Sequence, residues 1–186
     1  MSLLIFLGVV ALIGFWLVGL YNGLVSLRQR CKQAFSDIDV QLKLRHDLVP
    51  NLVETVKGYA AHEKSTLEEV IKARNMAVSA QGPAAQGAAE GALTGALSRL
   101  IALSEAYPDL KANQNFQQLQ SELADIENKI AASRRFFNNS AAEYNAARES
   151  FPSVFIAQRY DFQPQEFFEL EEAESKAVQE APKVQF

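Results

Sequence analysis

The stretch RHDLVPNLVETVKGYAAHE, residues 45–63, combines an apolar rhythm of helical period with charged side chains and a proline. The rhythm begins upstream, and its steps of three and four residues place one apolar seam along a single helix. The seam comprises Phe35, Ile38, Leu42, Arg45, Val49, Leu52, Val56, Tyr59 and Glu63. A second row of Leu48, Val53, Ala60, Leu67 and Ile71 widens the apolar face. A face of this width favours a helix bundle over a two-stranded coil.

The same periodicity returns in the second half of the chain. Apolar and small residues again step by three and four from Phe116 to Ala147, and Pro152 cannot continue a regular helix. Asn113 or Asn115 can cap the start of this helix. The Gly- and Ala-rich segment 79–91 predicts a loop, followed by a short helix over 92–106. No hairpin signal interrupts residues 24–150. We therefore expect an all-α fold, with one N-terminal transmembrane helix and an antiparallel bundle of long helices.

The first residues predict a membrane anchor. Leu3 to Leu20 is an unbroken run of apolar residues and glycines, and eighteen residues of helix span about 27 Å, close to the thickness of a bilayer's hydrocarbon core. The alternative of a cleaved signal peptide lacks a basic n-region and a convincing cleavage site. The expected lipid-facing residues include Leu3, Phe6, Val9, Leu12, Trp16 and Leu20.

Charges beside the anchor indicate its orientation. Arg28, Arg30 and Lys32 follow the apolar run, and basic residues stay on the cytoplasmic side. We expect an N-terminus outside, a body in the cytoplasm and, in a bacterium, a location in the inner membrane. The spacing of Gly19 and Gly23 would allow two membrane helices to approach each other.

The chain therefore divides into three predicted segments. Residues 1–23 form the anchor, residues 24–170 form the helical body, and the acid-rich residues 171–186 are expected to be disordered. Cys31 is the only cysteine, and we interpret it as a small buried or interfacial residue, with a lipidated juxtamembrane thiol as the alternative.

Polar residues on and beside the seams predict a buried network. Pro50 has no amide to bond the carbonyl of His46, so the helix should kink or restart there and free that carbonyl. A charge on a buried stripe is costly unless it is paired. We expect the two long helices to pack antiparallel and to join these groups, which would specify their register. The expected members are Arg45, Asp47, Asn51, Glu63, Glu127, Arg134, Asn138 and Asn145.

No constellation for catalysis or metal binding is visible in the sequence. His62 has no second histidine four residues later, and His46 lies about 160° away from it around an ideal helix. Neither a nucleophile elbow nor a phosphate-binding glycine loop is present. The formal net charge of −4 gives no support for nucleic-acid binding. We expect a protein that is not an enzyme, binds no nucleic acid and uses no metal or cofactor.

The order of several motifs resembles the LemA family. These are YNGLVSLR, RHDLVPNLVETVKGYAAHE, EAYPDLKANQNF, LADIENKI and SFPSVFIA, and the resemblance covers about residues 21–170. It implies a bacterial inner-membrane protein with one N-terminal span and a cytoplasmic bundle of the four-helix type. Phe137 departs from the family pattern, which usually has tyrosine there. The resemblance also implies, by genetic neighbourhood, a membrane metalloprotease of the HtpX type as a partner.

Two functions remain open at this stage. The first is a membrane-tethered scaffold that works with a membrane protease or in envelope quality control, and the second is a homo-oligomer that organises or shapes the membrane. The aromatic segment after Pro152 is too apolar for a free tail, so it should pack on the bundle or meet a partner. Its candidate partner-binding residues are Phe155, Ile156, Phe162, Phe167 and Phe168.

Overall fold

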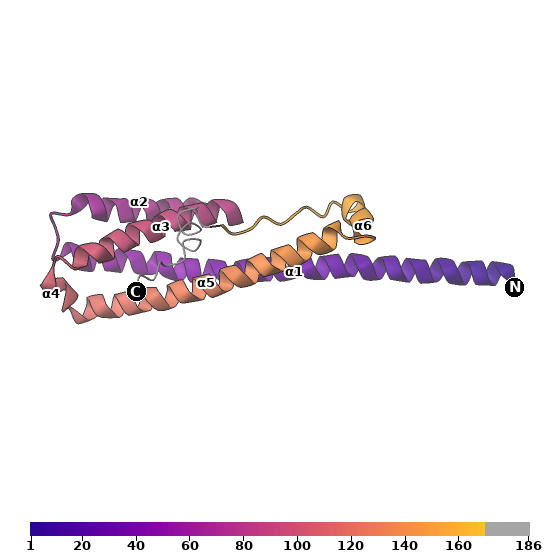
Figure 1. The fold of residues 1–186 in the computed structure, drawn as a ribbon, viewed down its shortest axis with the longest axis horizontal. Helices are drawn as coiled ribbons and strands as arrows, with labels where there is room; N and C mark the ends of the chain where they lie inside the picture. Colours follow the sequence, from indigo (N-terminus) through magenta and orange to yellow (C-terminus); the bar gives the residue numbers. More distant parts are fainter. Residues whose placement is uncertain (170–186) are drawn as a thin grey trace, which may run out of the picture. The chain divides into compact units, whose positions relative to one another are not determined.

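The computed structural model describes residues 1–169, and the predicted disordered tail, residues 171–186, lies outside this range. All regular structure within it is helical, as predicted (Figure 1). The helices are α1 (Ser2–Lys57), α2 (Lys64–Ser79), α3 (Pro83–Ser104), α4 (Pro108–Lys111), α5 (Gln114–Glu149) and α6 (Ser153–Arg159). The chain forms two compact units: unit 1 contains residues 1–37 and 133–167, and unit 2 contains residues 38–132 with Phe168 and Glu169.

α1 runs without a break from the apolar N-terminus through Pro50. In the part of the chain that the structure describes, it is the one helix long and apolar enough to cross a membrane. Its apolar window has a mean hydropathy of 2.8, and none of that window is buried, unlike the core helix of a soluble protein. The side chains predicted to face lipid are therefore exposed, except that of Leu20, which is half-buried. The exposed ones are Leu3, Phe6, Val9, Leu12 and Trp16. This exposure supports the predicted association with a membrane.

The sequence rhythm overestimated the length of this helix. The seam and its second row continue to Glu63 and Ile71, yet α1 ends at Lys57 and α2 begins at Lys64. Gly58 is the first residue of the turn between them. Val53 lies before this turn, in α1, and Leu67 and Ile71 lie after it, in α2. The residues that form one apolar row in the sequence therefore pack α1 against α2.

Unit 2 is a bundle built from the second part of α1, α2, α3 and the first part of α5 (Figure 1). Short turns reverse the chain after α1 and α2, and the short α4 lies between α3 and α5. The chain just after α1 meets the chain just before α5, where Asn113 Nδ2 donates a hydrogen bond to Tyr59 Oη over 2.9 Å. The core contains Val49, Leu52, Val53, Val56, Val70, Leu93, Leu97, Leu100, Leu110, Phe116 and Leu123, among others. The predicted antiparallel bundle is thus confirmed.

The predicted Gly- and Ala-rich loop over 79–91 is wrong from Pro83 onward, because α3 begins there. Gly82 has φ of +84° and makes the turn, and Pro83 starts the helix where a missing amide costs little. Alanine is the best helix former and outweighs the glycines. Gly87 also has a packing role, since a Cβ there would lie 2.0 Å from the carbonyl oxygen of Glu169. The glycine therefore lets the chain after Phe168 approach α3.

In unit 1, α1 and α5 also pack antiparallel. The ring centroids of Phe35 and Phe137 lie 5.4 Å apart, and Arg30 pairs with Glu143 over 2.8 Å further toward the N-terminus of α1. The ring of Phe137 is fully buried, so the residue that departs from the family pattern serves packing. Cys31 is buried in this unit as well, and burial raises the pKa of its thiol. A buried thiol with little thiolate is a poor acceptor for a lipid.

The chain after α6 is fixed to α5 by hydrogen bonds. Tyr144 Oη donates to the carbonyl of Gln163 over 2.9 Å. Asn145 holds the main chain of Gln165 from both sides, with Nδ2 donating to its carbonyl at 2.8 Å and Oδ1 accepting from its amide at 2.9 Å. This two-bond clamp explains why a segment without regular structure lies against the helix.

Replacing Asn113 tests the predicted cap of α5. Asn113 Oδ1 accepts the amide of Phe116 over 3.0 Å, so this asparagine caps the helix. We expect Asn113→Ala to lower the free energy of unfolding by about 1–2 kcal/mol, because the amide and the Tyr59 hydroxyl each lose a partner. Chemical unfolding of the full chain in detergent, followed by circular dichroism, measures this change. Asn115→Ala is the matched control, and an equal loss there would contradict the cap.

Candidate interaction site

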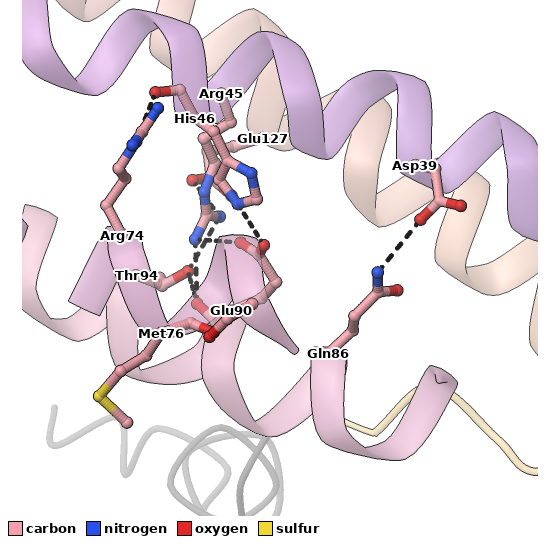
Figure 2. A network of polar contacts seen from close by, with 10 residues as sticks. Asp39, Arg45, His46, Arg74, Met76, Gln86, Glu90, Thr94 and Glu127 are labelled. Atoms are coloured by element: carbon pink, nitrogen blue, oxygen red, sulfur yellow. Dashed lines mark hydrogen bonds and ion pairs between the residues drawn. The ribbon is translucent and has the colours of Figure 1, made fainter. Parts of the chain in front are cut away.

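A fully buried guanidinium stands at the centre of unit 2. Arg45 comes from the seam of α1, and its side chain is 1% exposed. Its Nη1 donates to Glu127 Oε1 of α5 over 2.7 Å and to Thr94 Oγ1 of α3 over 3.2 Å. Its Nη2 donates to the main-chain carbonyl of Glu90 over 2.9 Å. One side chain thus joins three helices of the bundle (Figure 2).

The carboxylate of Glu90 is the second buried charge of the network. Its Oε2 lies 3.0 Å from Arg45 Nη2, which is close enough for an ion pair but lacks hydrogen-bond geometry. Its Oε1 lies 2.6 Å from His46 Nε2. Because an ionised carboxylate can only accept, the imidazole of His46 donates the proton of this contact when Glu90 is charged. Glu90 therefore binds two consecutive side chains of α1.

The proline of α1 has a specific consequence in this network. Pro50 leaves the carbonyl of His46 without its helical donor, and Arg74 Nε of α2 donates to that carbonyl over 3.1 Å (Figure 2). The sequence predicts a freed carbonyl at this point, although α1 continues instead of restarting. The proline thus converts a lost helical bond into a bond between two helices.

A second polar contact joins α1 and α3 one to two turns before Arg45. Gln86 Nε2 donates to Asp39 Oδ1 over 3.3 Å (Figure 2). Partial burial raises the pKa of the Asp39 carboxyl, and the hydrogen bond from Gln86 offsets part of that rise. Asp39 keeps much of its surface in solvent, so this contact adds less than the Arg45 network.

The structure brings together only part of the predicted network. Arg45 and Glu127 meet as the two seams predict, but Asp47 and Asn51 are exposed. Glu63 accepts a hydrogen bond from Tyr107 at the far end of unit 2. The remaining predicted members, Arg134, Asn138 and Asn145, lie on the part of α5 that belongs to unit 1.

Sequence reasoning missed Arg74, Glu90 and Thr94. Glu90 and Thr94 lie in or just after the stretch that reads as a loop, so their helical register is invisible until α3 is known to begin at Pro83. Once it is, Glu90 and Thr94 are four residues apart and fall on one face. The apolar Leu93 and Leu97 beside them could have indicated that this face is buried.

A groove between α1 and α2 lies on the same unit and holds about 1040 Å³. Its apolar lining includes Pro50 and Val53 of α1 and Leu67, Ile71 and Met76 of α2. The lining residues of each helix recur at intervals of three and four, so the groove follows the helix axes. On its edge lie Glu54, Lys57, Lys64, Glu68, Lys72, Asn75 and Ser79.

The groove offers a surface for binding, and the two histidines lie away from it. His46 is engaged with Glu90, and His62 is exposed on the turn between α1 and α2. Among residues 1–169, no three histidine, cysteine or acidic side chains gather as a metal ion would require. The titratable groups that are buried together stabilise helix contacts.

Fold and site together define a membrane-associated helical-bundle protein, in which one long helix is both the apolar N-terminal segment and a wall of the bundle. The LemA family profile matches residues 34–186. This match covers most of the chain, and the chain belongs to the LemA family.

Named relatives are similar over most of their length. The magnetosome protein MamQ of Magnetospirillum gryphiswaldense is 28% identical over 90% of this chain and 72% of its own. The protein LemA of Metamycoplasma hominis is 27% identical over 92% of this chain and 79% of its own. Neither name carries an enzymatic activity.

Replacing Arg45 tests the burial of the network. We expect Arg45→Met to lower the free energy of unfolding by about 3–5 kcal/mol, because it leaves the buried Glu90 carboxylate without its cation. Thermal and chemical unfolding of the full chain in detergent measure the loss. The control is Arg99→Met, which removes the exposed pair with Glu69 and should cost at most about 1 kcal/mol. Equal effects of the two substitutions would show that the Arg45 network adds nothing beyond a surface pair.

Proposed function

We propose that this chain is a membrane-anchored, non-enzymatic interaction protein whose groove between α1 and α2 binds a helix of another membrane protein. The groove is the observation that carries the proposal. It is open to solvent, it is apolar along its length, and the Arg45 network and the Arg74 bond stabilise the helices beside it. Amphipathic helices bind grooves of this form through apolar residues spaced by three and four.

The choice of a membrane-protein helix follows from the anchor and the charges. A chain attached to a bilayer through α1 meets partners of the same membrane at high effective concentration. Lys57, Lys64 and Lys72 outnumber Glu54 and Glu68 on the edge of the groove. Since Lys57 already pairs with Glu54, the remaining charges favour a partner helix with acidic flanks.

The location belongs to the same proposal. Arg28, Arg30 and Lys32 favour an outside N-terminus and a cytoplasmic body in the bacterial inner membrane. The family resemblance implies an HtpX-type membrane metalloprotease as one partner of this kind. A role in envelope quality control would follow if that protease supplies the helix.

Photo-crosslinking in the native membrane tests the proposal. We expect a photoreactive residue in place of Asn75, on the groove edge, to form an adduct with a helical segment of another integral membrane protein. Met76→Glu should abolish the adduct, because it places a charge on the apolar lining. Mass spectrometry of the digested adduct identifies the crosslinked segment and its flanking acids.

The matched control for this test lies on the same helix. Val78 is 53% exposed and Met76 is 52% exposed, but only Met76 lines the groove. Val78→Glu should therefore leave the adduct intact. An adduct with a second copy of this chain, an adduct with a soluble protein, or equal loss in both variants would overturn the proposal.

A further inference from the structure

Three large aromatic side chains at the end of unit 1 are exposed although the elements that carry them are packed. Phe151 is 80% exposed, Phe155 is 62% exposed and Tyr160 is 60% exposed. The neighbouring Ile156 and Ala157 of α6 are 8% and 4% exposed. α6 is thus held by one face and presents aromatic rings on the other. A cluster of this kind is uncommon on a surface that faces water alone.

The described aromatic segment therefore divides into two groups. Ile156, Phe162 and Phe168, three of the five predicted partner-binding residues, are buried inside the chain, so that part of the prediction is wrong. Only Phe155 and Phe167 keep enough exposed surface to meet another molecule. Of these two, Phe155 lies on α6, and the centroid of its ring lies 6.0 Å from that of Phe151.

The position of α6 along α1 decides what this surface meets. Phe155 and Tyr160 line a depression of about 430 Å³ together with Leu17, Val18 and Tyr21 of α1. The ring of Tyr160 also lies 5.0 Å from that of Tyr21. Leu17 belongs to the apolar run and lies three residues, or about 4.5 Å along the helix axis, before its end at Leu20. The exposed rings of α6 are thus level with the end of the membrane span.

We propose that α6, with Phe151 and Tyr160, is a second membrane contact that lies in the interface of the bilayer that α1 spans. The proposal rests on the membrane anchor of the proposed function. Aromatic rings concentrate at this depth, and short apolar faces bury about 5–10 Å into the boundary between headgroups and acyl chains. The occupant of the depression between α1 and α6 is then the acyl chain of a lipid.

The charges around α6 fit this position. Arg159 follows Phe155 by four residues, so both side chains lie on one face of the helix. Arg159 also lines the depression. The guanidinium of Arg28 lies 4.9 Å from the ring centre of Phe162. Cations beside apolar rings match lipid phosphates above acyl chains. Two contacts with the bilayer would fix the tilt of unit 1 against the membrane.

Tryptophan fluorescence of the full chain in lipid nanodiscs tests this depth. Trp16 is the only tryptophan, so Phe155→Trp in a Trp16→Phe background reports on α6 alone. We expect its emission to be blue-shifted, to be quenched by phosphatidylcholine with brominated acyl chains, and to resist aqueous iodide. Phe151→Trp in the same background is a second, independent reporter and should behave alike.

The matched control is Phe136→Trp in that background. Phe136 is 53% exposed on α5 of unit 1, next to Phe137, whose partner Phe35 lies fourteen residues beyond Tyr21 on α1. Its tryptophan should be quenched by iodide and spared by brominated lipids. Iodide quenching of both the Phe155→Trp and the Phe151→Trp reporters would overturn the proposal. Protection of these reporters from both quenchers would also overturn it, because protein would then cover them.

The wild-type chain separates this proposal from the anchor itself. Trp16 should be quenched by brominated lipids if α1 spans the bilayer. If brominated lipids quench Trp16 in the wild-type chain but quench neither the Phe155→Trp nor the Phe151→Trp reporter, only the second contact is overturned. Unquenched Trp16 would overturn the anchor on which both proposals rest.

Discussion

Burial of the Arg45 guanidinium is the constraint on which unit 2 depends. A charge with 1% exposure is tolerated only where carboxylates and carbonyls surround it, and here they come from α3 and α5. A shift of either helix by one turn would separate Arg45 from Glu90 or Glu127. Apolar side chains can pack in several helix registers at similar cost, but the ion pairs of Arg45 with Glu90 and Glu127 form in only one register. The network thereby selects a single arrangement of the helices around the groove.

Pro50 extends this constraint to α2. In a solvated helix the proline would leave only a kink, but here the freed carbonyl of His46 binds Arg74. Arg74 is adjacent to Asn75, and Pro50 and Asn75 both line the groove. The residues that fix the contact between α1 and α2 are thus neighbours of the residues that form the proposed binding surface. The stability of the bundle and the proposed binding would depend on the same short stretch of α1.

The sequence predicts the class of fold well because helical periodicity and an uncharged N-terminal run are local signals. It predicts the meeting of Arg45 and Glu127 because Arg45 lies on the apolar seam of one long helix and Glu127 lies beside the seam of the other. It fails at Glu90, because the glycines of 79–91 indicate a loop although alanine, the best helix former, accompanies them. The packing role of Gly87 against residue 169 cannot be recognised from the sequence. The prediction also fails at Gly58, where the apolar row continues in sequence while the chain turns.

For the aromatic segment after Pro152, the composition likewise does not show which individual residues are buried. Its apolar character indicates that it must be covered, but only the structure separates Phe162, which is buried beside Tyr21, from Phe155, which is exposed. We propose different roles for the exposed rings of α6 and the groove of unit 2, the first toward lipid and the second toward protein.

Native mass spectrometry of the full chain, released gently from its own membrane, tests the central claim most directly. We expect a complex of this chain with a second integral membrane protein. A discrete homo-oligomer without that protein, or a chain that is always alone, would contradict it. A homo-oligomer would instead favour a protein that organises the membrane by self-assembly.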